Sequence, residues 1–158
     1  MPKQALRTLL AALDWTGNWL PRLLLRGVLA YEFWQSGVEK LHGSNWFTEV
    51  HTQFPFPLNF VPVEISWHLA TWAELIGPAA LILGLGTRIT AVSLSLLTLV
   101  AIAAVHAGSG YNVCEEGWKL PFLYLVMFLP LILSGPGPVS VDHWLRSRHL
   151  RPRGLFHS

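Results

Sequence analysis

Cysteine and charge are both scarce in this sequence of 158 residues. The single cysteine, Cys114, excludes a disulfide within the chain and any redox or zinc motif of the Cys-x-x-Cys type. Charged residues make up 13% of the sequence, which is about half of their usual share in soluble domains. The basic residues form no stripe interleaved with aromatics, so the sequence does not favour nucleic-acid binding.

Apolar residues are abundant instead, at 52% of the sequence, and they include eight tryptophans and eight phenylalanines. Indole rings concentrate at the boundary between lipid and water. A soluble protein of this size has room for one domain and too little polar surface to cover so many apolar side chains. The composition therefore predicts an integral membrane protein.

Long apolar segments predict an all-α fold whose helices cross the membrane. A span needs about 20 mostly apolar residues. The segments that we assign as spans are residues 20–41, 67–85, 89–107 and 118–135. The first of these is the least apolar, and we accept it because Arg22 and Arg26 near its end can extend their head groups to the interface. The prediction is a membrane four-helix bundle in which residues 1–158 form one domain.

Basic residues predict how the spans are oriented. Nine of the eleven lysines and arginines fall near the N-terminus, in the 84–88 turn or in the C-terminal tail, and they include Arg22, Arg26 and Arg88. An even number of spans places these regions on one side, which the positive-inside rule makes cytoplasmic. We therefore assign these three arginines to anchoring and topology, with both termini in the cytoplasm of a bacterium and the spans in its inner membrane.

Segments outside the spans are expected to lie along the membrane surfaces. Leucines at positions 6, 9, 10 and 13 share one face, which favours a short interfacial helix over a cleavable signal peptide. The loop 42–66 is rich in aromatics and proline, so we expect an apolar cap over the outer helix ends. After the 135–138 turn, Ser140 or Asp142 can cap a short basic helix along the inner leaflet.

Two acidic residues, Glu32 and Glu74, lie near the centres of predicted spans. A carboxyl group at mid-membrane costs roughly 2.5 to 3.5 kcal/mol, so each needs a partner, a proton or a water-filled cavity. Helical spacing adds other polar side chains to the same faces and predicts a polar pocket that opens outward. The predicted pocket residues are Tyr31, Glu32, Gln35, Glu39, Thr71 and Glu74, with Ser36 as an alternative to Gln35.

The alternative to a functional pocket is a structural role, in which these polar groups hydrogen-bond between helices and lock the bundle. Lys40 is expected to form a local ion pair with the neighbouring Glu39 at the outer end of the first span.

A candidate metal site is formed by His68 and His106, predicted at the outer ends of neighbouring spans, and by Cys114 in the loop that follows. These ligand types suit copper or zinc, and two facing histidines suit haem, although the spacings match no metal motif. The alternatives are interfacial hydrogen bonds for the histidines and an unreactive small side chain for Cys114.

Several motifs resemble the DoxX-like membrane proteins over residues 20–145. They are the runs Arg26–Leu41 and Ala73–Arg88 and the closing Gly135–Asp142. Shorter segments, Gly43–Phe47, Phe54–Pro57 and Ser66–Trp72, are similar to the narrower HvfX-type branch. The DoxX resemblance implies a four-helix inner-membrane protein linked to quinone-dependent sulfur oxidation or quinol oxidation. The HvfX resemblance implies a link with the maturation of copper-binding modified peptides.

These features favour an accessory subunit, without catalysis of its own, in a redox, quinone-linked or copper-stress system. Quinone and copper are the candidate ligands. The expected partners are the lipid bilayer, a membrane or periplasmic protein, and a second copy of the chain. One alternative is a quinone-reactive oxidoreductase subunit in its own right. Another is a small-molecule or proton transporter, although the sequence has no clear internal repeat.

Overall fold

The computed structural model describes residues 2–115 and 117–149 and contains helices, turns and loops but no strand in those ranges. The all-α prediction is confirmed. Arg151 and Arg153 are two of the nine basic residues on which the predicted orientation rests, and they lie outside the described residues. The longer helices are α1 (Pro2–Gly17), α2 (Leu20–His42), α4 (Val63–Leu83), α5 (Thr87–Ala101), α6 (Lys119–Ser134) and α7 (Val141–His149). The short elements are α3 (Phe47–Val50), η1 (His51–Gln53), η2 (Leu58–Phe60), η3 (Ile102–His106) and η4 (Ala107–Ser109).

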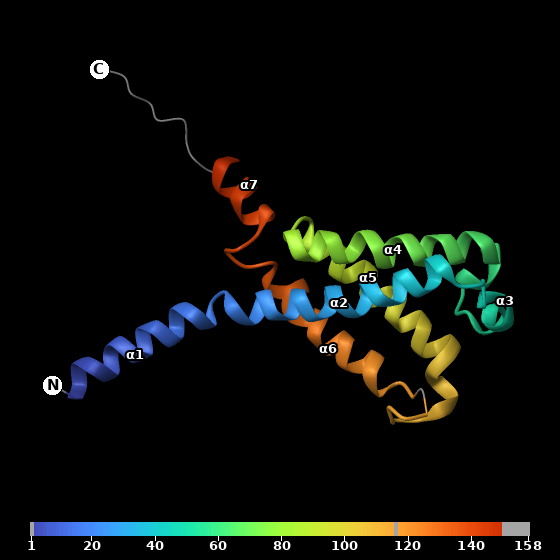
Figure 1. Cartoon of the computed structure of the whole chain (residues 1–158), viewed down its shortest axis with the longest axis horizontal. Coiled ribbons are helices and arrows are strands. Elements are labelled where there is room, and N and C mark those ends of the chain that lie inside the picture. The colour runs from blue at the N-terminus through green and yellow to red at the C-terminus, as the bar shows by residue number, and fades with distance from the viewer. Residues whose placement is uncertain (1, 116, 150–158) are drawn as a thin grey trace, which may run out of the picture.

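Four helices form a closed set of contacts that we call the helix ring: α2 packs on α4, α4 on α5, α5 on α6, and α6 on α2 (Figure 1). Their inward faces bury an apolar core because large side chains recur at helical spacing. The core includes Leu29 and Phe33 of α2, Leu81 of α4, Leu94 of α5 and Phe128 of α6.

The ring helices occupy the four predicted apolar segments with small shifts in their ends. Helix α4 begins at Val63, directly after Pro62, rather than at residue 67. Glu64 in its first turn is favourable there, because the N-terminus of a helix attracts negative charge. The helix α5 changes to a π-helix at Ile102–His106. Wider turns of this kind are common at functional sites, but here the segment joins α5 to the loop that leads into α6.

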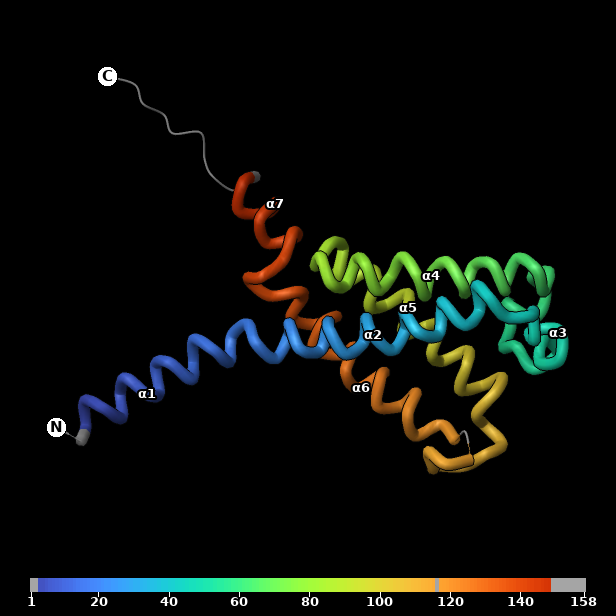
Figure 2. Tube along the Cα trace, in the orientation of Figure 1, coloured from blue at the N-terminus to red at the C-terminus, as the bar shows by residue number. Residues whose placement is uncertain are grey.

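The two ends of the ring differ in what they carry (Figure 2). Helices α1 and α7 both leave the ring at one end, which we call the terminal end. The short helix α3 lies at the opposite end, which we call the cap end. Helix α1 runs on from α2 away from the ring, so its leucines at 6, 9, 10 and 13 are 50–58% exposed. The amphipathic helix is present, and its position on a membrane surface stays a prediction.

The cap end is closed by aromatic side chains from the loop 42–66. The Phe47 ring packs edge-on against Trp46, Phe54 and Trp67 at centroid distances of 4.9, 5.3 and 5.1 Å. Such T-shaped contacts add stability beyond the apolar area they bury. Helix α3 contacts α4, and η1 contacts η3 at the end of α5. The expectation of an apolar cap over the helix ends is confirmed.

Among the described residues, one helix, Thr87–Ser109, is both long and apolar enough to cross a membrane, and Lys119–Ser134 is apolar but shorter. Helix α2 carries too many charged residues to qualify by composition. Yet the outward faces of all the ring helices expose large apolar side chains, which is costly in water and favourable in lipid. Examples are Trp34, Leu69, Trp72, Ile76, Ile89, Leu96 and Leu133.

Candidate functional site: a buried ion pair between α2 and α4

Gly37 brings the backbones of α2 and α4 close together. A Cβ atom at this position would lie 2.9 Å from the carbonyl carbon and oxygen of Glu74, so a larger residue would push the helices apart. The two helices run in opposite directions, with α2 ending and α4 beginning at the cap end (Figure 1). Lys40, one turn after Gly37, therefore lies on the face of α2 that meets α4.

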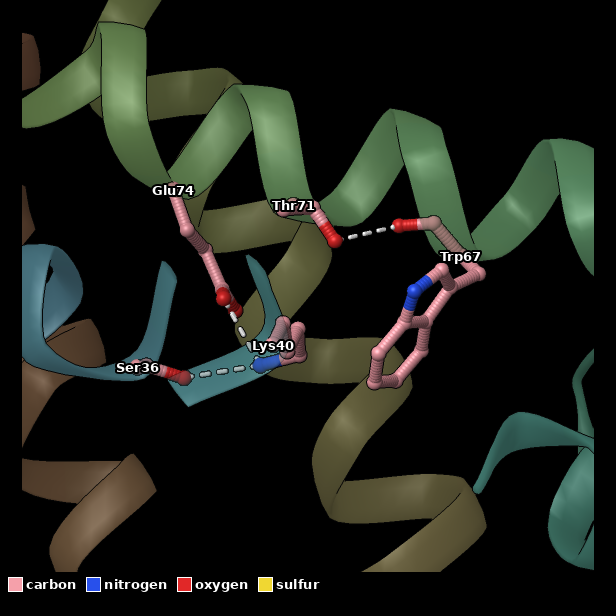
Figure 3. Close-up of polar contacts among 5 residues, drawn as sticks. All are labelled: Ser36, Lys40, Trp67, Thr71 and Glu74. Carbon is pink, nitrogen blue, oxygen red and sulfur yellow. Dashed lines mark hydrogen bonds and ion pairs between the residues drawn. The ribbon is translucent and has the colours of Figure 1, made fainter. Parts of the chain in front are cut away.

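The Lys40 ammonium uses this closeness to reach across to α4 (Figure 3). Its Nζ lies 2.7 Å from Glu74 Oε2, and it also donates to Ser36 Oγ at 2.7 Å. The side chains of Lys40 and Glu74 are 11% and 5% exposed. The expectation that Lys40 pairs with Glu39 was wrong. Helix packing at Gly37 presents a buried carboxylate to Lys40, whereas Glu39 is exposed.

Aromatic residues separate the ion pair from the cap end. Trp67, one turn before Thr71 on α4, is buried, and the Thr71 hydroxyl donates to the Trp67 carbonyl at 2.8 Å (Figure 3). The Lys40 Nζ lies 6.0 Å from the centroid of the Trp46 ring, within cation–π range. The pair is thus enclosed by apolar groups that strengthen its electrostatic attraction.

Glu32 has a different partner on a different helix. The Tyr124 hydroxyl of α6 donates to Glu32 Oε2 at 2.7 Å, and Glu32 is half-buried. Its carboxylate therefore does not share the site of Glu74. Tyr31 and Gln35 bond to each other on the exposed face of α2, with Gln35 Nε2 donating to the Tyr31 hydroxyl at 2.8 Å.

The six predicted pocket residues consequently fall into three places. Glu74 and Thr71 are buried against α2, Glu32 points toward α6, and Tyr31, Gln35 and Glu39 lie on exposed surface. The structure brings together Ser36, Lys40 and Glu74 instead. The sequence does carry a signal for the contact between α2 and α4. Ser36, Gly37 and Lys40 stand at positions i, i+1 and i+4 of a helix that has few other small residues. No comparable signal in the sequence pairs Tyr124 with Glu32.

The candidate metal ligands are not gathered into one site. His68 and Cys114 are exposed, and His106 lies half-buried in η3. Within residues 2–115 and 117–149, no group of three or more His, Cys, Asp or Glu side chains is placed to hold a metal ion. This arrangement gives no support to a copper, zinc or bis-histidine haem site built from these residues.

Arg26 forms a second buried polar site, near the terminal end. It is 2% exposed, and its guanidinium donates to Leu81 and Ile82 of α4 at 2.6 and 2.5 Å and to Pro136 and Val139 at 3.2 and 2.6 Å. The expectation that it extends toward the interface was wrong. Carbonyls at the end of a helix lack the full set of helical donors, and here the Leu81 carbonyl accepts from the Gly84 N–H at 3.1 Å as well as from Arg26. A planar cation with several N–H groups is well suited to this position.

Asp142 joins the same region from α7. Its carboxylate accepts from the backbone N–H groups of Gly86 and Thr87 at 2.8 and 3.0 Å, and its own N–H donates to the Gly84 carbonyl at 3.0 Å. A negative charge at the N-terminus of α5 is favourable because of the helix dipole. Ser140 caps α7 instead, accepting from the His143 N–H at 3.1 Å. The predicted choice between Ser140 and Asp142 is thereby resolved.

A family model described as DoxX matches residues 22–107, more than half of the chain, including α2, α4 and α5. The chain belongs to the DoxX family. Both the Lys40–Glu74 pair and the Arg26 site draw their α2 and α4 residues from the matched range. Family membership and the apolar Thr87–Ser109 helix together indicate association with a lipid bilayer.

Two relatives of this DoxX chain come from Haemophilus influenzae, and each is described only as an uncharacterized protein. One is 50% identical over 126 residues, which is 80% of this chain and 83% of the relative. The other is 34% identical over 125 residues, which is 75% of this chain and 86% of the relative. No solved structure matches the chain.

Proposed function

We propose that this DoxX-family chain is a four-span inner-membrane protein with both termini in the cytoplasm. It acts as an accessory subunit of a redox system, linked to quinone or to copper stress, and the Lys40–Glu74 pair handles a proton or a polar ligand there. The spans are α2, α4, α5 continued through η3, and α6. The outward apolar faces of these helices and the basic residues at the terminal end support this topology.

The observation that carries the proposal is the buried ion pair itself. Ionisable side chains inside a membrane helix bundle are expensive and are functional by default. A buried ion pair is also weak evidence for stability, since apolar replacements of similar size are often neutral or stabilising. A lysine, a carboxylate and a hydroxyl within 2.7 Å contacts form a short relay in which a proton can change sites.

A second candidate, a quinone-reactive subunit, is favoured by a groove between α2 and α4. The groove has a volume of about 520 Å³ and is almost entirely apolar, and its lining includes Gly27, Ala30, Tyr31, Trp34 and Ala79. A flat apolar ring with a hydrocarbon tail fits such a lining. Stoichiometric quinone extracted from the purified protein would favour this candidate.

The experiment that tests the main proposal replaces both members of the pair, Lys40→Met with Glu74→Leu, so that no unpaired charge remains. Cells that lack the native gene are complemented with wild type or variant, and two responses are measured: quinone-dependent respiration of isolated membranes and growth on added copper. The matched control is Glu39→Gln, which removes an exposed carboxylate next to Lys40 in the sequence.

The expected result is wild-type protein levels for both variants, the deletion phenotype for the double variant and full complementation by Glu39→Gln. Full complementation by the double variant, at normal membrane levels, would overturn the proposed role, because the cells would then function without the pair. Loss of the double variant from the membrane would also overturn it and would assign the pair to structure.

A further inference from the structure

A cleft of about 550 Å³ opens at the terminal end of the ring, and neither Lys40 nor Glu74 lines it. Separate parts of the chain line it: Arg22 in the first turn of α2, Arg88 in the first turn of α5, the 134–138 turn, and Arg146 on α7. Residues distant in sequence thus direct three guanidinium-bearing side chains at one space. Neither the ion pair nor its proposed role uses this cleft.

The cleft has an excess of positive charge. Its ionisable lining consists of three arginines, one aspartate and His143, so two net positive charges remain when the histidine is neutral. Asp142 is already occupied, because its two oxygens accept from Gly86 and Thr87. The carboxylate therefore orders the cleft wall, and after its negative charge is counted an excess of two positive charges remains.

The arginine donors are largely unused. Arg88 donates once, to the Leu133 carbonyl at 3.1 Å. For Arg22 and Arg146, no hydrogen bond or ion pair is found within the described parts of the chain. Two glycines in the 134–138 turn leave room for Arg22 and Arg88. A Cβ atom on Gly137 would lie 3.1 Å from Arg22 Cδ, and a Cβ atom on Gly135 would lie 3.4 Å from Arg88 Nε. Free guanidinium groups of this kind bind phosphate oxygens in bidentate fashion.

Apolar side chains border the same cleft. Ile89 and Leu145 line it and are 76% and 38% exposed, and Trp144 beside them is 50% exposed. A free inorganic anion has no use for apolar neighbours, whereas a phospholipid places a phosphate directly beside its acyl chains. Basic pockets between membrane helices at the cytoplasmic side suit anionic headgroups.

We propose that the cleft formed by Arg22, Arg88 and Arg146 binds the phosphate of an anionic phospholipid in the leaflet at the terminal end. The site holds the headgroup between α2, α5 and α7, so that a lipid molecule ties the C-terminal helix to the ring. The inference rests on the membrane setting of the proposed function and is independent of any redox role.

The test is lipid retention by the full chain, purified in mild detergent with phosphatidylglycerol or phosphatidylcholine and measured by native mass spectrometry. The key variant is Arg146→Gln, and its matched control is Arg148→Gln on the same helix. Arg148 lies over the Trp144 ring at 3.8 Å and does not line the cleft. Both variants remove one charge from an exposed side chain of α7, so both are expected to fold.

The expected result is retention of phosphatidylglycerol over phosphatidylcholine, an affinity about tenfold lower in Arg146→Gln, and little change in Arg148→Gln, because one charge-assisted hydrogen-bond set is lost. Equal losses in the two variants, or equal retention of both lipids, would overturn the site. Displacement of the lipid by millimolar inorganic phosphate would assign the cleft to free phosphate instead and overturn the lipid assignment. A failure here leaves the respiration result for the Lys40–Glu74 variants unaffected.

Discussion

Two cations on one face of α2, Arg26 and Lys40, are buried in contrasting ways. Arg26 donates to backbone carbonyls of α4 and of the C-terminal segment, with no carboxylate within hydrogen-bond distance among the described residues. Lys40 donates to side chains, the Glu74 carboxylate and the Ser36 hydroxyl. Both side chains contact α4, Arg26 from the first half of α2 and Lys40 from its last turn.

The difference lies in what the partners can do. Carbonyl dipoles at the end of a helix stabilise a cation but cannot take up its proton or change charge. A carboxylate can be protonated, and a lysine ammonium can release a proton when its environment changes. The Arg26 site is therefore a fixed structural connection, whereas the Lys40–Glu74 site is able to change its state. Under the proposed function, the contrast assigns stability to the Arg26 site and function to the Lys40–Glu74 site of the same helix.

The largest effect is expected when Arg26 is changed to leucine. The change removes the guanidinium donors from the carbonyls of Leu81, Ile82 and Val139, and of these the Leu81 carbonyl keeps a donor in the Gly84 N–H at 3.1 Å. The loss of these charge-assisted hydrogen bonds is expected to cost about 4 kcal/mol in the free energy of unfolding. Thermal unfolding of the purified protein and its level in membranes measure the loss. The chain is expected to accumulate poorly.

Two further variants sharpen this prediction. Arg26→Lys keeps the charge but lacks the planar fork, so it is expected to recover only part of the stability. Arg22→Gln, one turn earlier on α2, removes a half-buried arginine with no backbone contact of this kind and is expected to be well tolerated. If Arg26→Leu unfolds at the same temperature as Arg22→Gln, the carbonyl network does not hold the ring together.

The next effect concerns the ion pair and has a different pattern. Lys40→Met alone leaves a buried carboxylate without its partner and is expected to lower the free energy of unfolding by about 3 kcal/mol. Adding Glu74→Leu removes that carboxylate, so the double variant is expected to regain most of the stability. Chemical denaturation of wild type, both single variants and the double variant measures the coupling. Additive losses would mean that the two side chains do not interact as the structure indicates.

The contrast between the two sites also explains what the sequence could predict. Apolar periodicity predicted the helices of the ring, and the aromatic loop 42–66 predicted the cap, because both follow from local spacing. Glu74 stood out because a carboxyl group is unusual in an apolar helix. Its partner was not predictable in the same way, since Lys40 has a nearer carboxylate in the sequence and only the close approach at Gly37 redirects it. Arg26 was assigned to the interface because its partners are backbone atoms, which no residue pattern reveals.

The smallest expected loss of stability is at Asp142, which links α7 to the terminal end of the ring. Asp142→Asn keeps one oxygen for the N–H of Gly86 or Thr87 but removes the charge from the N-terminus of α5. The expected loss is about 1 kcal/mol, and Asp142→Ala, which removes both acceptors, should lose about 2 kcal/mol. Thermal unfolding at low and high salt separates the two contributions, because salt screens the dipole interaction and leaves the hydrogen bonds. If Asn and Ala variants unfold together, the charge alone matters at this position. If both variants match wild type, two other contacts are sufficient to hold α7 to the ring. They are the hydrogen bond from Arg26 to the Val139 carbonyl and the one from the Asp142 N–H to the Gly84 carbonyl. The Asp142 carboxylate would then add no stability at this end of the ring.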